Sequence, residues 1–127
     1  NLISNLLLEY VSDLSQHPFP EYLRLGVPVA LATDDRGMWD STMTDEYFVA
    51  VKSFNLSWDE LRLLTQNSIQ YSFLGPEPKS RLLNAVDTRL LAFEKYWQTQ
   101  DPKQIGALKR SPKRGFICRN YDLCERD

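Results

Sequence analysis

The chain has 127 residues, 43% of them hydrophobic, and a formal net charge of −2 at pH 7. This length suits one ordinary domain, and the hydrophobic content is sufficient to fill a core. The slightly acidic balance argues against a general nucleic-acid-binding protein, and no apolar run approaches the roughly 18 residues that a membrane span requires. We therefore expect neither nucleic acid nor a membrane as a partner.

The N-terminal quarter predicts two short helices. Apolar residues recur at i, i+4, i+7 spacing over residues 5–14, which favours a helix capped by Ser4 or Asn5. This helix should end before Pro18, because the residue that precedes a proline avoids the helical region. A second short helix is predicted over residues 19–25, between a proline-rich start and a glycine.

Residues 27–33 (VPVALAT) predict a buried β-strand that ends on two adjacent acids. The segment is continuously apolar or small, as in a strand of a parallel sheet that is covered on both faces. Asp34 and Asp35 follow it directly. From the residues alone, this pair forms either a turn or helix cap, or a site for a cation or a polar substrate.

The next 65 or so residues predict three longer helices. Thr44 can cap a helix that reaches about Phe54, and Ser57 and Glu60 have the spacing of a capping box for the next one. A third, long helix follows a glycine- and proline-rich break. We interpret its apolar stripe as packing and not as a cofactor site; the stripe comprises Leu82 or Leu83, Val86, Leu90, Phe93 and Trp97.

Residues 101–127 predict a basic extension. They contain seven Lys or Arg against four Asp or Glu and no clear hydrophobic period, which favours a solvated segment. Contact with an anionic surface is the alternative. The spacing of Cys118 and Cys124 is not a usual zinc signature. We expect ordinary thiols in a cytoplasmic protein, with a disulfide that closes a small loop as the alternative.

The chain contains only one predicted strand, although a buried strand of this kind requires neighbouring strands. Its backbone N–H and C=O groups need partners, and its two apolar faces require parallel neighbours that this chain does not offer. We therefore expect the missing strands to precede Asn1 in a larger fold, of which this chain is the C-terminal part.

Several short motifs follow one another in a specific order. They are Ser4-Asn5, His17-Pro18, Gly-Val-Pro-Val before Thr33-Asp34-Asp35, an acidic helix start with Glu46-Tyr47, and Asn67-Ser68-Ile69 before Ser72-Phe73. Together they resemble the last third of the adenosine/AMP deaminase family, within the metal-dependent hydrolases, over about residues 1–97. The resemblance implies an α/β fold in which residues 1–100 are the mostly helical C-terminal part of a (β/α)8 TIM barrel.

The resemblance also implies a function for the two acids. The family removes the 6-amino group of a purine with the help of Zn²⁺, so we expect hydrolysis of adenosine to inosine and ammonia. Asp34 is then a metal ligand and Asp35 a substrate-binding residue, both at the C-terminal end of the eighth barrel strand. The general acid and the zinc-binding histidines have no counterpart here and are expected in the missing N-terminal portion of the barrel.

The substrate and the class of protein stay open at this stage. Arg36 stands where the family pattern has a proline. It either contacts a phosphate, which would favour AMP or another adenine nucleotide, or faces solvent, which we prefer. His17, Glu46 and Asn67 are expected to have structural roles. The alternative of another class is a non-catalytic binding or regulatory module derived from the fold.

Overall fold

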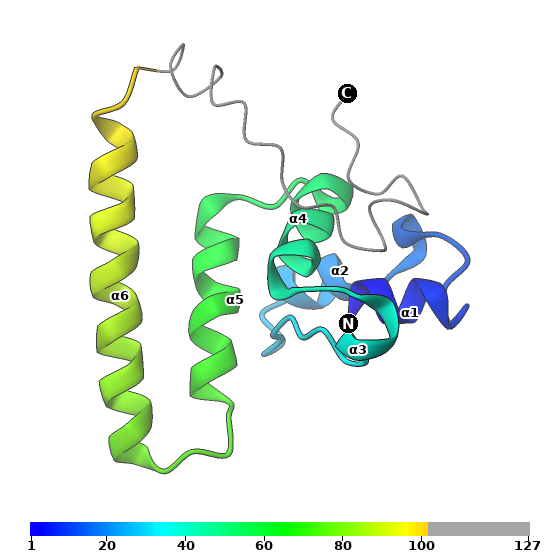
Figure 1. Cartoon of the computed structure of the whole chain (residues 1–127), viewed down its shortest axis with the longest axis horizontal. Helices are drawn as coiled ribbons and strands as arrows, with labels where there is room; N and C mark the ends of the chain where they lie inside the picture. The colour runs from blue at the N-terminus through cyan, green and yellow to red at the C-terminus, as the bar shows by residue number, and fades with distance from the viewer. Residues whose placement is uncertain (102–127) are drawn as a thin grey trace. The chain divides into compact units, whose positions relative to one another are not determined.

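The computed structural model describes residues 1–101 (Figure 1). These residues divide into two compact units, 1–68 and 69–101, which we treat separately. The regular structure among them is helical. The helices are α1 (Leu2–Leu7), the 3₁₀ helix η1 (Leu14–Gln16), α2 (Phe19–Arg24), α3 (Arg36–Trp39), α4 (Met43–Phe54), α5 (Trp58–Gln70) and α6 (Pro76–Gln98).

The strand predicted over residues 27–33 is not formed, and that prediction is wrong. A strand needs ladder hydrogen bonds to a neighbouring strand, and residues 1–101 contain no second strand. The segment nevertheless keeps the period of two that is typical of an extended chain. Val29, Leu31 and Thr33 are at least partly buried, whereas Pro28, Ala30 and Ala32 are exposed.

The first predicted helix has the wrong bounds. It was expected over residues 5–14, but α1 begins at Leu2 and ends at Leu7, and η1 follows after a turn. Glu9 adopts a left-handed backbone conformation with φ of 58°, which interrupts the helix. The apolar spacing misled the prediction because Tyr10 is 75% exposed and does not extend a buried face.

Two other helices form at the predicted places. The predicted short helix after Pro18 is α2, and Gly26 follows it with φ of 78°, as expected of a glycine stop. Helix α4 ends at Phe54 as predicted, but its N-cap is Thr42 and not Thr44. Thr42 and Asp45 cap each other reciprocally: the Asp45 carboxylate accepts the Thr42 N–H at 2.7 Å, and Thr42 Oγ1 accepts the Asp45 N–H at 3.3 Å.

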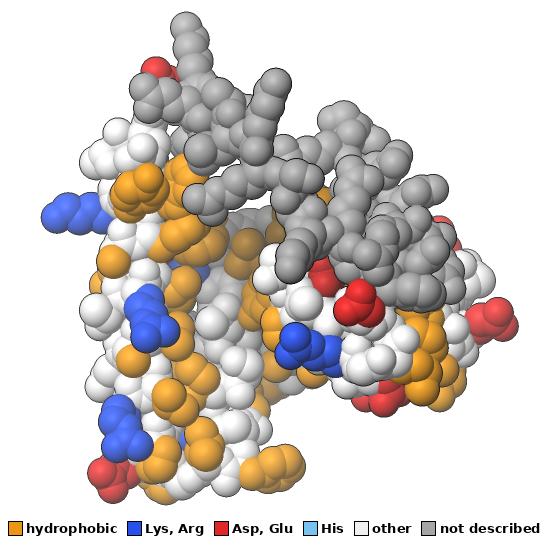
Figure 2. All heavy atoms as spheres, in the orientation of Figure 1, with side chains coloured by type: hydrophobic (Ala, Val, Ile, Leu, Met, Phe, Trp, Pro, Cys, Tyr) orange, Lys and Arg blue, Asp and Glu red, His pale blue; other side chains and the backbone are white. Residues whose placement is uncertain are grey.

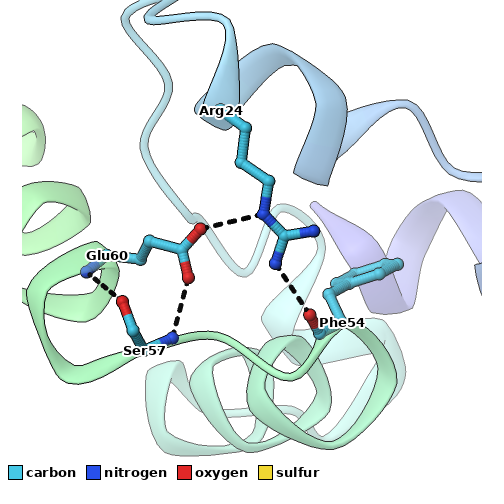
Figure 3. Close-up of polar contacts among 4 residues, drawn as sticks. All are labelled: Arg24, Phe54, Ser57 and Glu60. Carbon is cyan, nitrogen blue, oxygen red and sulfur yellow. Dashed lines mark hydrogen bonds and ion pairs between the residues drawn. The ribbon is translucent and has the colours of Figure 1, made fainter.

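The predicted capping box of α5 is confirmed and is tied to α2 (Figure 3). Ser57 N–H donates to Glu60 Oε2 at 2.7 Å, and Glu60 N–H donates to Ser57 Oγ at 3.2 Å. The other carboxylate oxygen of Glu60 accepts from Arg24 Nε at 3.0 Å, and Arg24 also donates to the carbonyl of Phe54 at 3.1 Å. Arg24 therefore joins α2 to the end of α4 and the start of α5.

The core of the first unit is assembled from all its longer helices and from the extended segment. α1 packs against α4 in this core. The buried apolar side chains are Leu2, Ile3, Leu14, Phe19, Leu23, Leu31, Val49, Ala50, Phe54, Leu56 and Leu64. Burial of one large apolar side chain contributes roughly 1.5–3 kcal/mol to the stability of the folded chain. Because Leu31 belongs to this core, the core also holds the segment that leads to Asp34.

In the second unit, α6 follows Gly75 with two prolines in its first turn. Its predicted apolar stripe is only partly buried, and Phe93 in the stripe is 49% exposed. Figure 2 shows hydrophobic side chains on the visible face of this helix, interspersed with Lys and Arg. None of the helices among residues 1–101 is both long and apolar enough to cross a membrane. The predicted basic extension, from residue 102 on, and both cysteines lie outside the described residues.

Candidate functional site

Asp34 and Asp35 form a tight turn at the end of the extended segment. Asp34 has a left-handed backbone conformation with φ of 51°. Asp35 has φ of −80° and ψ of 58°, and Arg36 N–H donates to the Asp34 carbonyl at 2.8 Å, which is the geometry of an inverse γ-turn. Asp35 precedes α3, but its side chain makes no capping hydrogen bond. The backbone alone forms the turn, because neither carboxylate has a hydrogen bond to the backbone of the turn.

The two carboxylates have different surroundings, although both residues are exposed. The hydroxyl of Ser4 donates to Asp34 Oδ2 at 2.8 Å. Asp34 Oδ1 and the whole carboxylate of Asp35 have no hydrogen-bond partner among residues 1–101, and neither does the exposed guanidinium of Arg36. Thus one oxygen of Asp34 is held from within the protein, and the other is free.

Glu46 anchors the helix that carries Ser4. Glu46 is fully buried, and its carboxylate accepts the backbone N–H of Leu2 at 2.9 Å and of Ile3 at 3.2 Å. These N–H groups belong to the first turn of α1 and have no partner within the helix. Burial raises the pKa of Glu46, and the two N–H donors oppose that rise. The expected structural role is confirmed, but the helix that Glu46 caps is α1 and not its own.

His17 also has the structural role that was expected. Its Nδ1 accepts the Phe19 N–H at 3.0 Å, and the side-chain amide of Asn5 lies 2.9 Å from Nε2. The ring centroid is 6.4 Å from that of Phe19 and 6.5 Å from that of Phe54. Burial lowers the pKa of His17. Both ring nitrogens have a polar neighbour, so His17 links the end of η1 to α2 through Phe19 and to α1 through Asn5.

Asn67 lies on α5 and holds the extended segment. It is largely buried, and its side-chain amide donates to the carbonyl of Val29 at 2.8 Å. The expected helix-face contact of Asn67 is therefore present. The hydroxyl of Tyr47 lies 3.0 Å from Thr65 Oγ1 and links α4 to α5.

The described residues do not by themselves form a metal centre. Residues 1–101 contain no group of three or more His, Cys, Asp or Glu side chains that could hold a metal. The free oxygen of Asp34 fits a single carboxylate ligand, and a zinc site has three or four protein ligands. Two open pockets, of about 440 and 540 Å³, do not include Asp34 or Asp35. A complete site would need residues beyond those described.

Residues 2–89 match the adenosine deaminase family. The chain belongs to the adenosine deaminase family. Similar members of this family include an adenosine deaminase from Enterococcus faecalis, 33% identical over 69% of this chain and 26% of the relative. An aminodeoxyfutalosine deaminase from Streptomyces coelicolor is 34% identical over 71% of this chain and 23% of the relative. An adenine deaminase from Aspergillus oryzae is 34% identical over 67% of this chain and 24% of the relative.

The fold of this deaminase-family chain matches that of a solved relative. The crystal structure of an adenine deaminase from Arthrobacter aurescens superposes with a TM-score of 0.65 at 32% identity, and the match covers 70% of this chain and 27% of that one. The expected fold class, a mostly helical C-terminal part of a (β/α)8 barrel, is confirmed. The chain spans about a quarter of the length of the curated relatives that it matches.

Proposed function

We propose that this chain contributes Asp34 and Asp35 to the active site of a zinc-dependent deaminase that hydrolyses adenosine to inosine and ammonia. Membership of the adenosine deaminase family supports this proposal. The observation that carries it is the position of these two exposed acids. They lie at the C-terminal end of an extended segment whose one face is packed on helices and whose other face is exposed.

The alternation of exposure supports an inward orientation of Asp34 in a barrel. Helices surround a (β/α)8 barrel, so the side chains of a strand that contact helices point outward and the alternate ones point to the interior. Here Val29 and Leu31 are the side chains turned to the helical core, whereas Ala30 and Ala32 are exposed. Asp34 continues the series of Ala30 and Ala32, at the strand end where barrel enzymes place their active sites.

The proposed chemistry assigns a different task to each acid. The reaction consumes one water, forms a C6–O bond and breaks the C6–N bond of the purine, with release of ammonia. Zinc, when bound, supplies an activated water at neutral pH. Asp34 would hold the ion with the oxygen that Ser4 leaves free. Asp35 would accept a hydrogen bond from the purine ring and orient the attacking water.

The substrate class follows from the chemistry that the named relatives share. They are called adenosine, adenine and aminodeoxyfutalosine deaminases, and we propose a 6-aminopurine nucleoside as the substrate of this protein. One observation favours a nucleotide such as AMP as the second candidate. The guanidinium of Arg36 is exposed, lies one residue beyond Asp35 and has no partner among the described residues, so it could meet a phosphate.

The test uses the complete polypeptide that contains this chain. Asp34→Ala should lose zinc on dialysis and should lose deamination, whereas Asp35→Asn should keep zinc and lose about 10²–10⁴-fold in kcat/KM. The matched control is Asp59→Asn, an exposed acid in the first turn of α5, which should behave like the unmodified enzyme. Full zinc content and turnover in Asp34→Ala would refute the proposal.

The same preparation decides between the substrates. Turnover of adenosine and AMP is compared before and after Arg36→Ala. A nucleoside enzyme should show equal activity on adenosine in both proteins. A loss that is confined to AMP would favour the nucleotide, and it would replace adenosine in the proposal.

A further inference from the structure

We infer that Ser4 is a positioning residue for Asp34, and that it selects which carboxylate oxygen is left for the metal. This inference rests on the proposed function, in which Asp34 is a metal ligand. It concerns a residue on α1, 30 positions before Asp34 in the sequence.

Ser4 contacts the side chain of Asp34 directly. Ser4 is fully buried, and its hydroxyl donates to Oδ2 of Asp34 at 2.8 Å. Since Asp34 is otherwise exposed, this bond is the one interaction of its side chain within the described residues. Hydrogen bonds to the second oxygen of a ligating carboxylate orient it and tune its affinity. The bond from Ser4 therefore fixes Oδ2 of Asp34 and leaves Oδ1 for a metal ion.

The backbone at Asp34 also needs support from its surroundings. A φ of 51° is uncommon for a residue other than glycine, and such conformations persist where the surroundings impose them. Two hydrogen bonds hold Asp34: Arg36 N–H binds its carbonyl at 2.8 Å, and Ser4 binds its side chain. Without Ser4, the Arg36 N–H bond would still hold the backbone of Asp34, but the carboxylate would be free to rotate.

Ser4 is itself held in place by its neighbours in α1. It lies directly after Leu2 and Ile3, whose N–H groups are bound by the buried carboxylate of Glu46. Leu2 and Ile3 are fully buried in the core, where α1 packs against α4. The orientation of Asp34 is thus set through α1 by a side chain of α4.

The experiment measures metal affinity of the complete polypeptide, by competition of zinc with a chelator. Ser4→Ala should weaken zinc binding by about 10–100-fold, the range found for partners of metal ligands. Ser4→Thr keeps the hydroxyl and should restore most of that affinity. Ser12→Ala is the control, because it removes an exposed hydroxyl whose one hydrogen bond within residues 1–101 is to Gln16.

A second readout separates positioning from stability. The thermal midpoint of each metal-free variant is measured alongside its affinity. A merely structural Ser4 would lower the midpoint of the Ala variant and leave the zinc affinity of the folded protein unchanged, which would overturn the inference. If Ser4→Thr is too crowded to fold at this buried position, the comparison of Ser4→Ala with Ser12→Ala still decides.

Failure of the inference and failure of the proposed function give different results. If Asp34→Ala loses zinc but Ser4→Ala binds it like the control, Asp34 is a ligand and the positioning role is wrong. If Asp34→Ala retains zinc, the proposed function fails and the inference fails with it.

Discussion

The side-chain amide of Asn67 donates a 2.8 Å hydrogen bond to the backbone carbonyl of Val29, 38 residues earlier in the sequence. In a β-sheet this carbonyl would receive its hydrogen bond from a neighbouring strand. Here a side chain of α5 supplies it, because residues 1–101 contain no second strand. Asn67 thus satisfies part of the polar backbone of the segment that leads to Asp34.

Substitution of Asn67 should loosen this segment. Asn67→Ala leaves the Val29 carbonyl without its donor, and an unpaired buried group costs about 1–3 kcal/mol. Asn67→Asp should cost more above pH 5, because a carboxylate oxygen would then face the carbonyl oxygen. Urea denaturation measures the cost. The control is Asn84→Asp on the exposed surface of α6. An Ala variant as stable as the unmodified protein would contradict the hydrogen bond.

Glu46 should be among the most sensitive positions for stability. Glu46→Ala removes the acceptor for two buried N–H groups, those of Leu2 and Ile3. At roughly 1–3 kcal/mol for each group, the loss is about 2–6 kcal/mol. Glu46→Gln should lose less, because the amide oxygen can still accept one of them. The measurement is the free energy of unfolding, with Glu21→Ala on the exposed surface of α2 as the control. A loss no larger than that of the control would show that the cap is dispensable.

The lowered pKa of His17 should make the stability of the protein depend on pH. Burial lowers its pKa in the folded protein, so below its ordinary value of 6.5 the unfolded chain binds more protons than the folded one. The contribution is fully present above 6.5 and is lost as the pH falls toward the lowered folded value. Protonation at Nδ1 would also break the bond from the Phe19 N–H.

The pH effect is measured as the difference in Tm between pH 7.5 and pH 5.5. His17 is the one histidine among the 127 residues, so the unmodified protein should lose more Tm on acidification than His17→Gln. The change of Tm in His17→Gln gives the contribution of the carboxyl groups, because these groups titrate in both proteins. Parallel changes of Tm in the two proteins would contradict the lowered pKa.

Much of the helical structure was predictable because helix boundaries depend on residues that are close in sequence. The Ser57–Glu60 capping box, the start of α6 after Gly75 and the end of α4 at Phe54 are local features. The shift of the α4 cap to Thr42 shows the limit of this reasoning. Thr42 and Thr44 both have an acidic residue nearby, and only the backbone geometry decides which one is the cap.

The sequence by itself determined the positions of α2, α4, α5 and α6 and the membership of the deaminase family, through the order of its motifs. The tertiary structure decided three things: that residues 27–33 are extended but unpaired, that Glu46 caps α1, and that Ser4 binds Asp34. The physical reason is the range of the interactions. A cap within one helix joins residues three apart, whereas the contacts of Ser4, Glu46 and Asn67 span 30 to 44 residues and exist only once the helices have packed.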